Sequence, residues 1–237
     1  MMTAAVWDHL LVAFLLAFVP VYGRISYRSL TRRLAAGDPG ARRSEYLWTI
    51  AFEWGLLAVV LVGFGVIGSR PLAALGFDLP QGWRSIGGAI ATLTGLALLV
   101  AQWRAISRVD ATGLEGLREQ LAGASALVPR TDAEHRIFRA VALTAGIVEE
   151  IVYRGYLIWY MTAFVGAWPA ALAAAVAFGL GHFYQGPSGV VKTGVAGLVA
   201  GGLFVATGSI LWPIVLHVAV DLHGGAVGRR ALGTAPA

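Results

Sequence analysis

The sequence contains no cysteine, and only 13% of its 237 residues are charged. Without cysteine the chain has no disulfide, no thiolate metal site and no cysteine nucleophile. Because charge is scarce and 57% of the residues are hydrophobic, the chain cannot present a polar surface to water on all sides. The composition therefore indicates a membrane protein.

Seven apolar runs are long enough to cross a bilayer as helices, since a hydrocarbon core of about 30 Å needs roughly 17–25 residues. They lie at about 6–23, 47–68, 85–106, 138–162, 168–185, 189–207 and 210–228. We therefore expect an all-α, polytopic membrane protein with about seven transmembrane helices. The sequence shows no internal repeat and no second domain, so residues 1–237 are expected to form a single membrane domain.

The distribution of arginine predicts the orientation. The loop after the first run carries six arginines, Arg24, Arg28, Arg32, Arg33, Arg42 and Arg43. By the positive-inside rule this loop is cytoplasmic, which places the N-terminus outside and the C-terminus in the cytoplasm of a multi-pass cell-membrane protein. The net charge of +5 is therefore interpreted as topology, and the lipid bilayer, not nucleic acid, is the expected partner.

Two further stretches have recognisable patterns. Residues 107–134 mix both charge signs with weak apolar periodicity, which is typical of a helix lying on the membrane surface. The sixth run is rich in glycine and contains a GxxxG pattern at Gly197 and Gly201. Small residues let membrane helices approach closely, so we expect a packing face there.

The fourth run contains three ionisable residues within six positions, at 149–154 in the sequence EEIVYR. Each such group costs about 2.5–3.5 kcal/mol at the centre of a membrane helix. Glu150 and Arg154 are four residues apart, so they lie on one face and can pair. Glu149 lies about 100° further round the helix and has no such partner. An unpaired carboxylate in a membrane helix is by default a hypothesis for a functional site.

Two more polar pairs with the same spacing interrupt apolar runs. Phe178 and His182 share a face of the fifth run, and His217 and Asp221 share a face of the seventh. At a rise of about 1.5 Å per residue, both histidines, Glu149 and Asp221 lie roughly 10–20 Å from the cytoplasmic side. We therefore expect them to converge on one cavity. A carboxylate, two imidazoles and a second acid are groups that can activate water and stabilise an oxyanion.

Other polar residues in apolar runs are interpreted as structural. A single histidine on an apolar helix is more often a hydrogen-bonded structural residue, and His9 and His223 are interpreted in this way. Glu53 lies near the cytoplasmic end of the second run, where its side chain can extend to the headgroups, so it is also interpreted as structural.

The three motifs, in this order on three hydrophobic helices, resemble the CPBP family of intramembrane glutamic endopeptidases. This family includes CAAX prenyl endopeptidases of the Rce1 type and bacterial proteins linked to bacteriocin processing or self-immunity. The resemblance covers about residues 140–225 and implies an all-helical catalytic core at about 138–228. It implies hydrolysis of a peptide bond by a glutamate-activated water without a metal or other cofactor. The substrate would be a CAAX-like peptide, a bacteriocin or another membrane-associated peptide or protein.

The resemblance also implies roles for residues at matching positions. Glu149 would be the general base, and His182 would help to hold the water. His217 and Asp221 would face the oxyanion of the tetrahedral intermediate.

Three residues would support this machinery. Glu150 and Arg154 would form an ion pair, and Phe178 would pack beside the site. The chain departs from the commoner family pattern at Asp221, where many members have asparagine.

Two hypotheses for Asp221 follow from this departure. An ionised carboxylate would repel an oxyanion, so in the oxyanion role Asp221 would have to be protonated and donate its O–H. Alternatively, Asp221 stays ionised and orients His217, which then meets the oxyanion alone. We favour the neutral donor.

Two other classes of function remain open at this stage. A zinc metalloprotease could use Glu149, His182 and His217 as ligands, although the sequence lacks a His-Glu-x-x-His helix. A non-hydrolytic transporter, proton relay or immunity protein could use the same groups to carry protons or to bind a partner. Transporters often have broken helices or repeated halves, and the sequence indicates neither.

Overall fold

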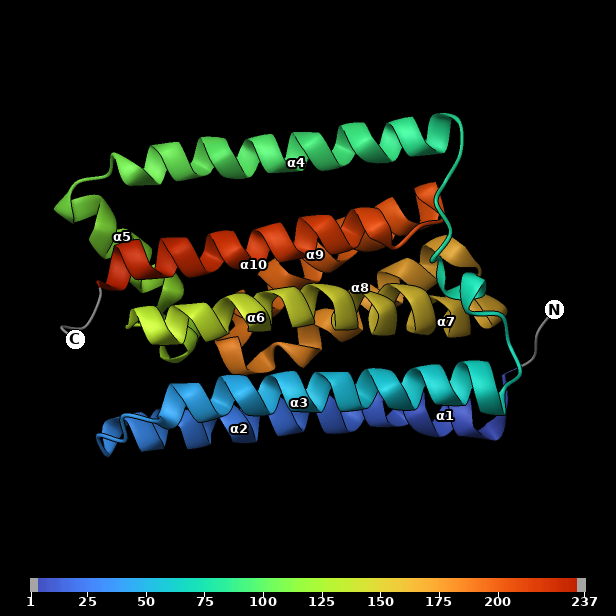
Figure 1. Ribbon diagram of the computed structural model, residues 1–237, viewed down its shortest axis with the longest axis horizontal. Coiled ribbons are helices and arrows are strands. Elements are labelled where there is room, and N and C mark those ends of the chain that lie inside the picture. The colour runs from blue at the N-terminus through green and yellow to red at the C-terminus, as the bar shows by residue number, and fades with distance from the viewer. Residues whose placement is uncertain (1–3, 234–237) are drawn as a thin grey trace.

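The computed structural model describes residues 4–233, and within that range the chain is helical and contains no strand (Figure 1). The α-helices are α1 (Val6–Ala13), α2 (Val19–Ala35), α3 (Ala41–Leu61), α4 (Trp83–Ser107), α5 (Ala111–Leu121), α6 (Asp132–Glu149), α7 (Ile158–Val165), α8 (Ala167–Gly181), α9 (Gly186–Thr207) and α10 (Leu211–Leu232). Three π-helical segments continue them, at Phe14–Phe18, Val62–Ile67 and Glu150–Leu157. Three short 3-10 segments lie at Leu72–Leu75, Ala122–Leu127 and Phe183–Gln185. The prediction of an all-α protein is confirmed.

Each predicted apolar run lies in a helix, but not every helix has the length and composition of a membrane span. Among the described residues, five helices are long and apolar enough: Val6–Ala35, Ala41–Ile67, Trp83–Ser107, Phe183–Thr207 and Leu211–Leu232. The apolar helix α8 has only 15 residues. The helix formed by α6 and α7 carries the three ionisable residues at 149–154. The structure supports a multi-pass membrane protein, and the count of seven spans stays a prediction.

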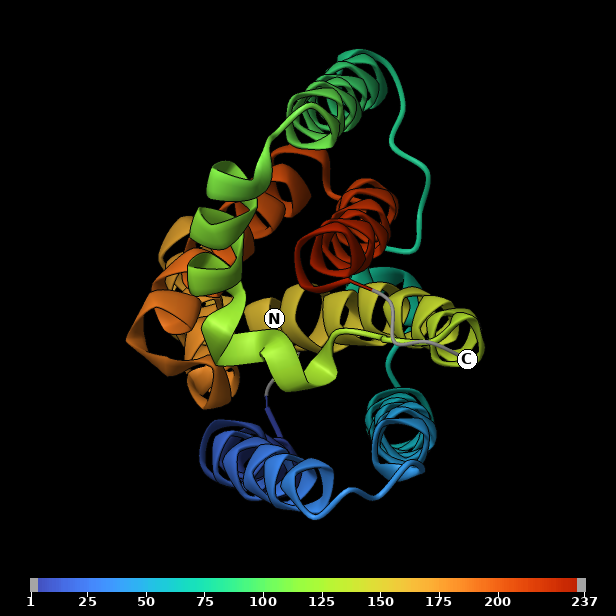
Figure 2. The same ribbon diagram turned by 90° about the vertical axis from the view of Figure 1, so that its left-hand side faces the viewer.

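The helix α6 lies in the middle of the bundle, with α3 on one side and α10 on the other (Figures 1 and 2). The helix α4 packs along α10, and α8 and α9 form a closely packed pair. The helix α1 begins at one end of the bundle, and α10 ends at the opposite end (Figure 1). Which of these ends faces the cytoplasm stays a prediction.

The segment before α6 covers one end of the bundle. Its helix α5 contains no buried residue and runs across that end in Figure 2, as expected for a surface helix. The start of α6 is fixed by a capping box. The hydroxyl of Thr131 accepts the N–H of Glu134 at 3.1 Å, and the Glu134 carboxylate accepts the N–H of Thr131 at 3.2 Å. This cap sets where α6 begins and therefore where its last residue, Glu149, lies.

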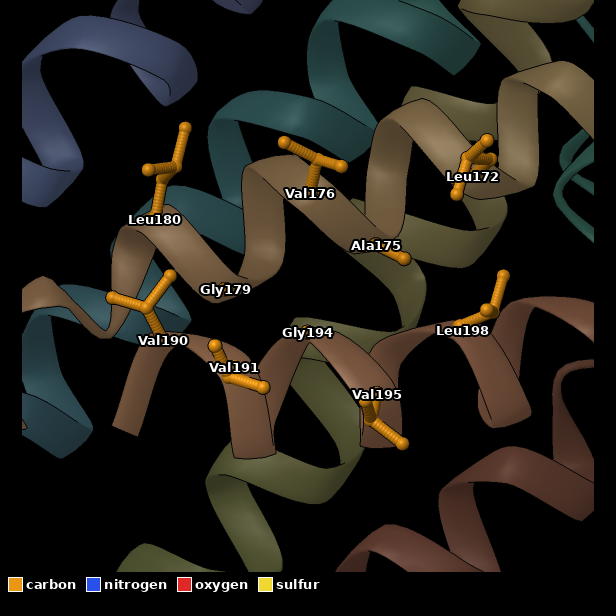
Figure 3. A pocket seen from close by; sticks show the side chains of 10 residues that line it. All are labelled: Leu172, Ala175, Val176, Gly179, Leu180, Val190, Val191, Gly194, Val195 and Leu198. Atoms are coloured by element: carbon orange, nitrogen blue, oxygen red, sulfur yellow. The ribbon is translucent and has the colours of Figure 1, made fainter. Parts of the chain in front are cut away.

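Glycines bring α8 and α9 together. A Cβ atom added to Gly179 would lie 2.7 Å from the carbonyl oxygen of Val190 and 3.1 Å from the Cα of Gly194. Figure 3 shows Gly179 and Gly194 facing each other across this pair of helices. Gly197 lies in the same interface, where an added Cβ would be 3.1 Å from the ring of Phe178. The prediction of a packing face on the sixth apolar run is confirmed.

A buried ion pair attaches the first helix to the centre of the bundle. The carboxylate of Asp8 accepts two hydrogen bonds from Arg70, at 2.9 and 2.8 Å, and one from the hydroxyl of Tyr156 at 3.0 Å. Asp8 is fully buried, and the Arg70 guanidinium lies 4.5 Å from the ring centre of Trp159. Tyr156 belongs to the segment Glu150–Leu157, so this pair holds the far end of that segment against α1.

The close approach of α6 and α10 depends on Gly146. A Cβ there would lie 2.4 Å from Cγ2 of Val218 and 2.9 Å from its backbone nitrogen, so the helices would have to separate. We expect Gly146→Ala to lower the unfolding midpoint temperature in detergent, although alanine gains about 1 kcal/mol in helix propensity. Gly87→Ala is the matched control on α4, because no heavy atom lies within 4 Å of its added Cβ. If the Gly146→Ala protein is as stable as the Gly87→Ala protein, α6 and α10 can accommodate the added Cβ and the prediction is wrong.

Candidate active site

The helix that carries the candidate site changes its winding at the site. The α-helical part ends at Glu149, and the π-helical segment Glu150–Leu157 continues it to α7. All residues of this segment are buried. Such π-helical segments are rare and occur frequently at functional sites. Nothing in the residue pattern predicts this change of winding.

Glu150 is completely buried and is contacted by one residue of its own helix and by one residue of α10. Its Oε1 lies 2.9 Å from Nη1 of Arg154 and 2.7 Å from Nδ1 of His217. The ion pair with Arg154 was expected from the four-residue spacing, whereas the contact with His217 on α10 was not. A carboxylate paired with arginine is ionised and can only accept hydrogen bonds, so Nδ1 of His217 carries a proton and donates it. Glu150 thereby fixes both the orientation and the tautomer of His217.

The guanidinium of Arg154 lies between Glu150 and aromatic surface. It stacks over the ring of Phe178 with its central carbon 4.3 Å from the ring centre, and Arg154 is only 2% exposed. An added Cβ at Gly197 would lie 3.3 Å from Nη2 of Arg154. A cation over an aromatic ring contributes about 2 kcal/mol when both are desolvated. Phe178 therefore packs beside the site, and Gly197 leaves the space that this cation occupies.

The other ring nitrogen of His217 faces two further acids. Its Nε2 lies 3.6 Å from Oε2 of Glu149 and 3.7 Å from Oδ2 of Asp221. Both distances exceed the roughly 2.7–3.2 Å of a direct hydrogen bond. The Glu149 side chain is 21% exposed, against 1% for Glu150. Asp221 faces the same nitrogen as Glu149, while Glu150 holds the opposite nitrogen, and both hypotheses for Asp221 stay predictions.

His182 lies on the wall of the site at the end of α8. Its Nδ1 is 2.9 Å from the carbonyl oxygen of Phe178, to which it donates. The Phe178 ring is 4.7 Å from the ring of His182 and 5.8 Å from that of His217, so it lies against both imidazoles. In the part of the chain that the structure describes, no ion pair joins His182 to an acid. Its Nε2 is therefore available to a molecule in the site.

A cavity of about 760 Å³ connects these side chains. Ligand sites commonly have volumes of roughly 300–1,000 Å³. The cavity wall contains all seven predicted site residues, Glu149, Glu150, Arg154, Phe178, His182, His217 and Asp221. The three motifs therefore surround one cavity, and the chemical roles of their residues stay predictions.

The interpretation of Glu53 as a residue that extends to the headgroups is wrong. Its side chain lines the cavity and is only 8% exposed. Its Oε2 is buried and has no hydrogen-bond partner. Glu149 and Asp221 line the same cavity. The sequence pattern that could have identified Glu53 as a site residue is the one that identified Glu149, namely an unpaired acid within an apolar run.

The remaining intramembrane histidines have ordinary structural partners. Nδ1 of His9 lies 2.6 Å from the hydroxyl of Tyr160, and Nε2 of His223 lies 2.9 Å from Oε1 of Gln102. Each histidine forms the hydrogen bond that its interpretation as a structural residue expects, and that interpretation stays a prediction.

The residues of the zinc alternative do not form a ready ligand set. Within residues 4–233, no group of three or more His, Cys, Asp or Glu side chains is placed to hold a metal ion. Nδ1 of His217 and Nδ1 of His182 are both engaged in hydrogen bonds, so each imidazole has only Nε2 to offer. The alternative with Glu149 as third ligand would require these side chains to rearrange.

Removal of Arg154 should destabilise the protein because it leaves Glu150 buried without its strongest partner. Breaking a buried pair in this way costs about 3–5 kcal/mol, so Arg154→Leu should unfold at much lower urea concentration in detergent. Adding Glu150→Gln to Arg154→Leu should recover part of the loss, because the amide is uncharged. Glu115→Gln is the control, since it breaks an exposed pair with Arg118 and should cost less than about 1 kcal/mol. Equal stability of Arg154→Leu and the unaltered protein would contradict this assignment.

Residues 135–223 match the family model described as type II CAAX prenyl endopeptidase, Rce1-like. The matched segment begins in α6, ends in α10 and contains the three motifs that surround the cavity. No curated protein and no solved structure matches the chain. The resemblance stated from the three motifs is confirmed: residues 135–223 of this chain are similar to the Rce1-like family of type II CAAX prenyl endopeptidases.

Proposed function

We propose that this protein is an intramembrane endopeptidase that hydrolyses a peptide bond with a water activated by Glu149. The observation that carries the proposal is the position of His217. Its Nδ1 is held by the buried Glu150, while its Nε2 lies 3.6 Å from Glu149 at the cavity. A carboxylate beside a fixed imidazole in a mostly apolar cavity suits proton transfer and oxyanion stabilisation. The family match supports peptidase activity.

In the proposed first step, a water lies in the cavity between Glu149 and His182. The Glu149 carboxylate takes one proton from the water, and Nε2 of His182 accepts a hydrogen bond from the other O–H. The water oxygen forms a bond to the carbonyl carbon of the substrate, and the electron pair of the C=O bond moves onto the carbonyl oxygen. The product is a tetrahedral oxyanion.

His217 and Asp221 are proposed to stabilise this oxyanion. Because Nδ1 of His217 donates to Glu150, Nε2 can donate as well only when the ring is protonated. The charges of Glu149 and Glu150 then cancel those of Arg154 and His217. Among these five groups the charges balance only if Asp221 is neutral, which favours the hypothesis that Asp221 donates an O–H to the oxyanion.

The last step returns the proton from Glu149. The oxyanion collapses, the C–N bond breaks, and the leaving nitrogen takes the proton that Glu149 removed from water. The products are a carboxylic acid and an amine, and Glu149 is again a carboxylate. One residue thus serves first as general base and then as general acid.

The position of the cavity within apolar helices supports a membrane-associated substrate. Its wall includes residues of α2, α3, α4, α6, α9 and α10. We propose a CAAX-like peptide, a bacteriocin or the tail of a membrane protein as substrate, and the cell membrane as the location. We also propose that no metal or other cofactor takes part. A transporter, proton relay or immunity protein would show no hydrolysis.

Replacing Glu149 tests the proposed base. Glu149→Gln keeps the size and polarity of the side chain and removes its basicity, so the protein should fold normally and lose peptide hydrolysis. General base catalysis contributes about 10²–10⁴-fold, so turnover in nanodiscs should fall at least about 10²-fold. The products are measured by mass spectrometry of a membrane-peptide library. Normal turnover of a folded Glu149→Gln protein would refute the assignment.

A loss of activity in Glu149→Gln would also follow if Glu149 were a zinc ligand, so a metal control accompanies this test. The unaltered protein should keep full activity in the presence of a strong chelator, and elemental analysis of active protein should find less metal than protein. Inhibition by chelator that zinc reverses would establish the metalloprotease alternative.

Replacing Asp221 separates its two hypotheses. If Asp221 is a neutral donor, Asp221→Asn keeps a donor and should retain turnover within about threefold, whereas Asp221→Leu should lose about 10²–10³-fold. If Asp221 acts as a carboxylate, both variants should lose activity to a similar extent. Initial rates of all three proteins on the same peptide distinguish these outcomes.

A further inference from the structure

Glu53 stands apart from the other acids on the cavity wall. Glu45 accepts a hydrogen bond from the hydroxyl of Ser26 at 2.5 Å, and Glu150 forms an ion pair with Arg154 and a hydrogen bond with His217. Glu149 and Asp221 both face Nε2 of His217. Among the described residues, Glu53 alone of these acids has no hydrogen bond and no ion pair. It is nevertheless more than nine-tenths buried.

The charges of the cavity leave Glu53 without a counterion. The cations on the wall are Arg154 and, when protonated, the two histidines. Arg154 is engaged by Glu150, and His217 lies between Glu150 and the acids of the proposed reaction. The other acids on this wall include Glu149 and Asp221, and within residues 4–233 no ion pair joins a cation to Glu53. A buried carboxyl group without a counterion is favoured in its neutral form, and a cation that enters the cavity would favour the carboxylate and form an ion pair with it.

We propose that Glu53 forms a subsite that binds the positively charged side chain of a lysine or arginine in the substrate. The inference rests on the proposed function in taking a peptide as the ligand. It assigns a residue of α3, which lies outside the family-matched segment 135–223. The subsite would select substrates by a charge near the cleaved bond.

The surroundings of Glu53 suit a long side chain with a charged tip. The wall of the same cavity includes the apolar side chains of Phe52, Leu56, Leu98 and Leu99. Lysine and arginine place an aliphatic stem against apolar surface and a cation at the end. The attraction between a carboxylate and such a cation is stronger in apolar surroundings than in water, because the local dielectric constant is lower, and it opposes the cost of removing both charges from water. A neutral or acidic side chain would leave Glu53 unpaired.

The test measures binding, so that it does not depend on hydrolysis. The probes are N-acylated, fluorescent peptides of alanine and leucine in which one lysine occupies each position in turn. Each is compared with a peptide that has norleucine, the uncharged analogue of similar length, at the same position. Dissociation constants are measured by fluorescence anisotropy with the Glu149→Gln protein in nanodiscs.

At one or more positions, lysine should bind about tenfold more tightly than norleucine. Adding Glu53→Gln to the Glu149→Gln protein should reduce this preference to less than about twofold. Adding Glu119→Gln, which removes the same charge from an exposed position on α5, should leave it unchanged. Absence of a lysine preference, or its persistence in the Glu53→Gln protein, would overturn the proposal.

A second measurement covers the case in which Glu53→Gln fails to fold. A carbodiimide joins a carboxylate to a lysine amine in direct contact, and mass spectrometry identifies the residue. Coupling to Glu53 in the Glu149→Gln protein is expected, and coupling only to other acids would overturn the proposal.

Cleavage by the unaltered protein without any lysine preference would refute the subsite alone. Lysine-dependent binding without cleavage would refute the peptidase proposal alone.

Discussion

A buried carboxylate that must have partners determines the geometry of this site. Glu150 has no access to water and accepts contacts from Arg154 on its own helix and from His217 on α10. The contact with His217 links the central helix to the last helix and leaves only one ring nitrogen facing the cavity. Glu149, the preceding residue of the chain, lies with its Oε2 3.6 Å from that nitrogen. Two adjacent glutamates therefore have different surroundings, one completely buried and one partly exposed at the cavity.

Small residues make these contacts possible. The approach of α6 to α10 occurs at Gly146, about one turn from Glu149, and the guanidinium of Arg154 lies against Gly197. In a membrane, helices gain little from hydrophobic burial against each other, so close packing has to supply much of the association. The glycines of α8 and α9 therefore support the site as well as the fold.

The sequence predicted those features that depend on spacing within one helix. The pairing of Glu150 with Arg154 follows from helical periodicity. The same periodicity places His182 on one face with Phe178, and His217 on one face with Asp221. The contact between Glu150 and His217 depends on how two helices distant in sequence pack, and periodicity carries no such information. Glu53 was misinterpreted because the side chain of an acid near the end of an apolar run can either extend to the headgroups or face the interior of the bundle. Only the packing of α3 shows that Glu53 faces inward.

The central claim is that Glu150 holds Nδ1 of His217 and leaves Nε2 to the cavity. Nitrogen-15 NMR of histidine-labelled protein in nanodiscs tests it directly, with a His217→Gln sample to identify the signal. The account predicts a protonated Nδ1 on His217 whose resonance shifts in Glu150→Gln and stays in place in Glu149→Gln. A neutral ring that carries its proton on Nε2, with a resonance unaffected by Glu150→Gln, would contradict the account.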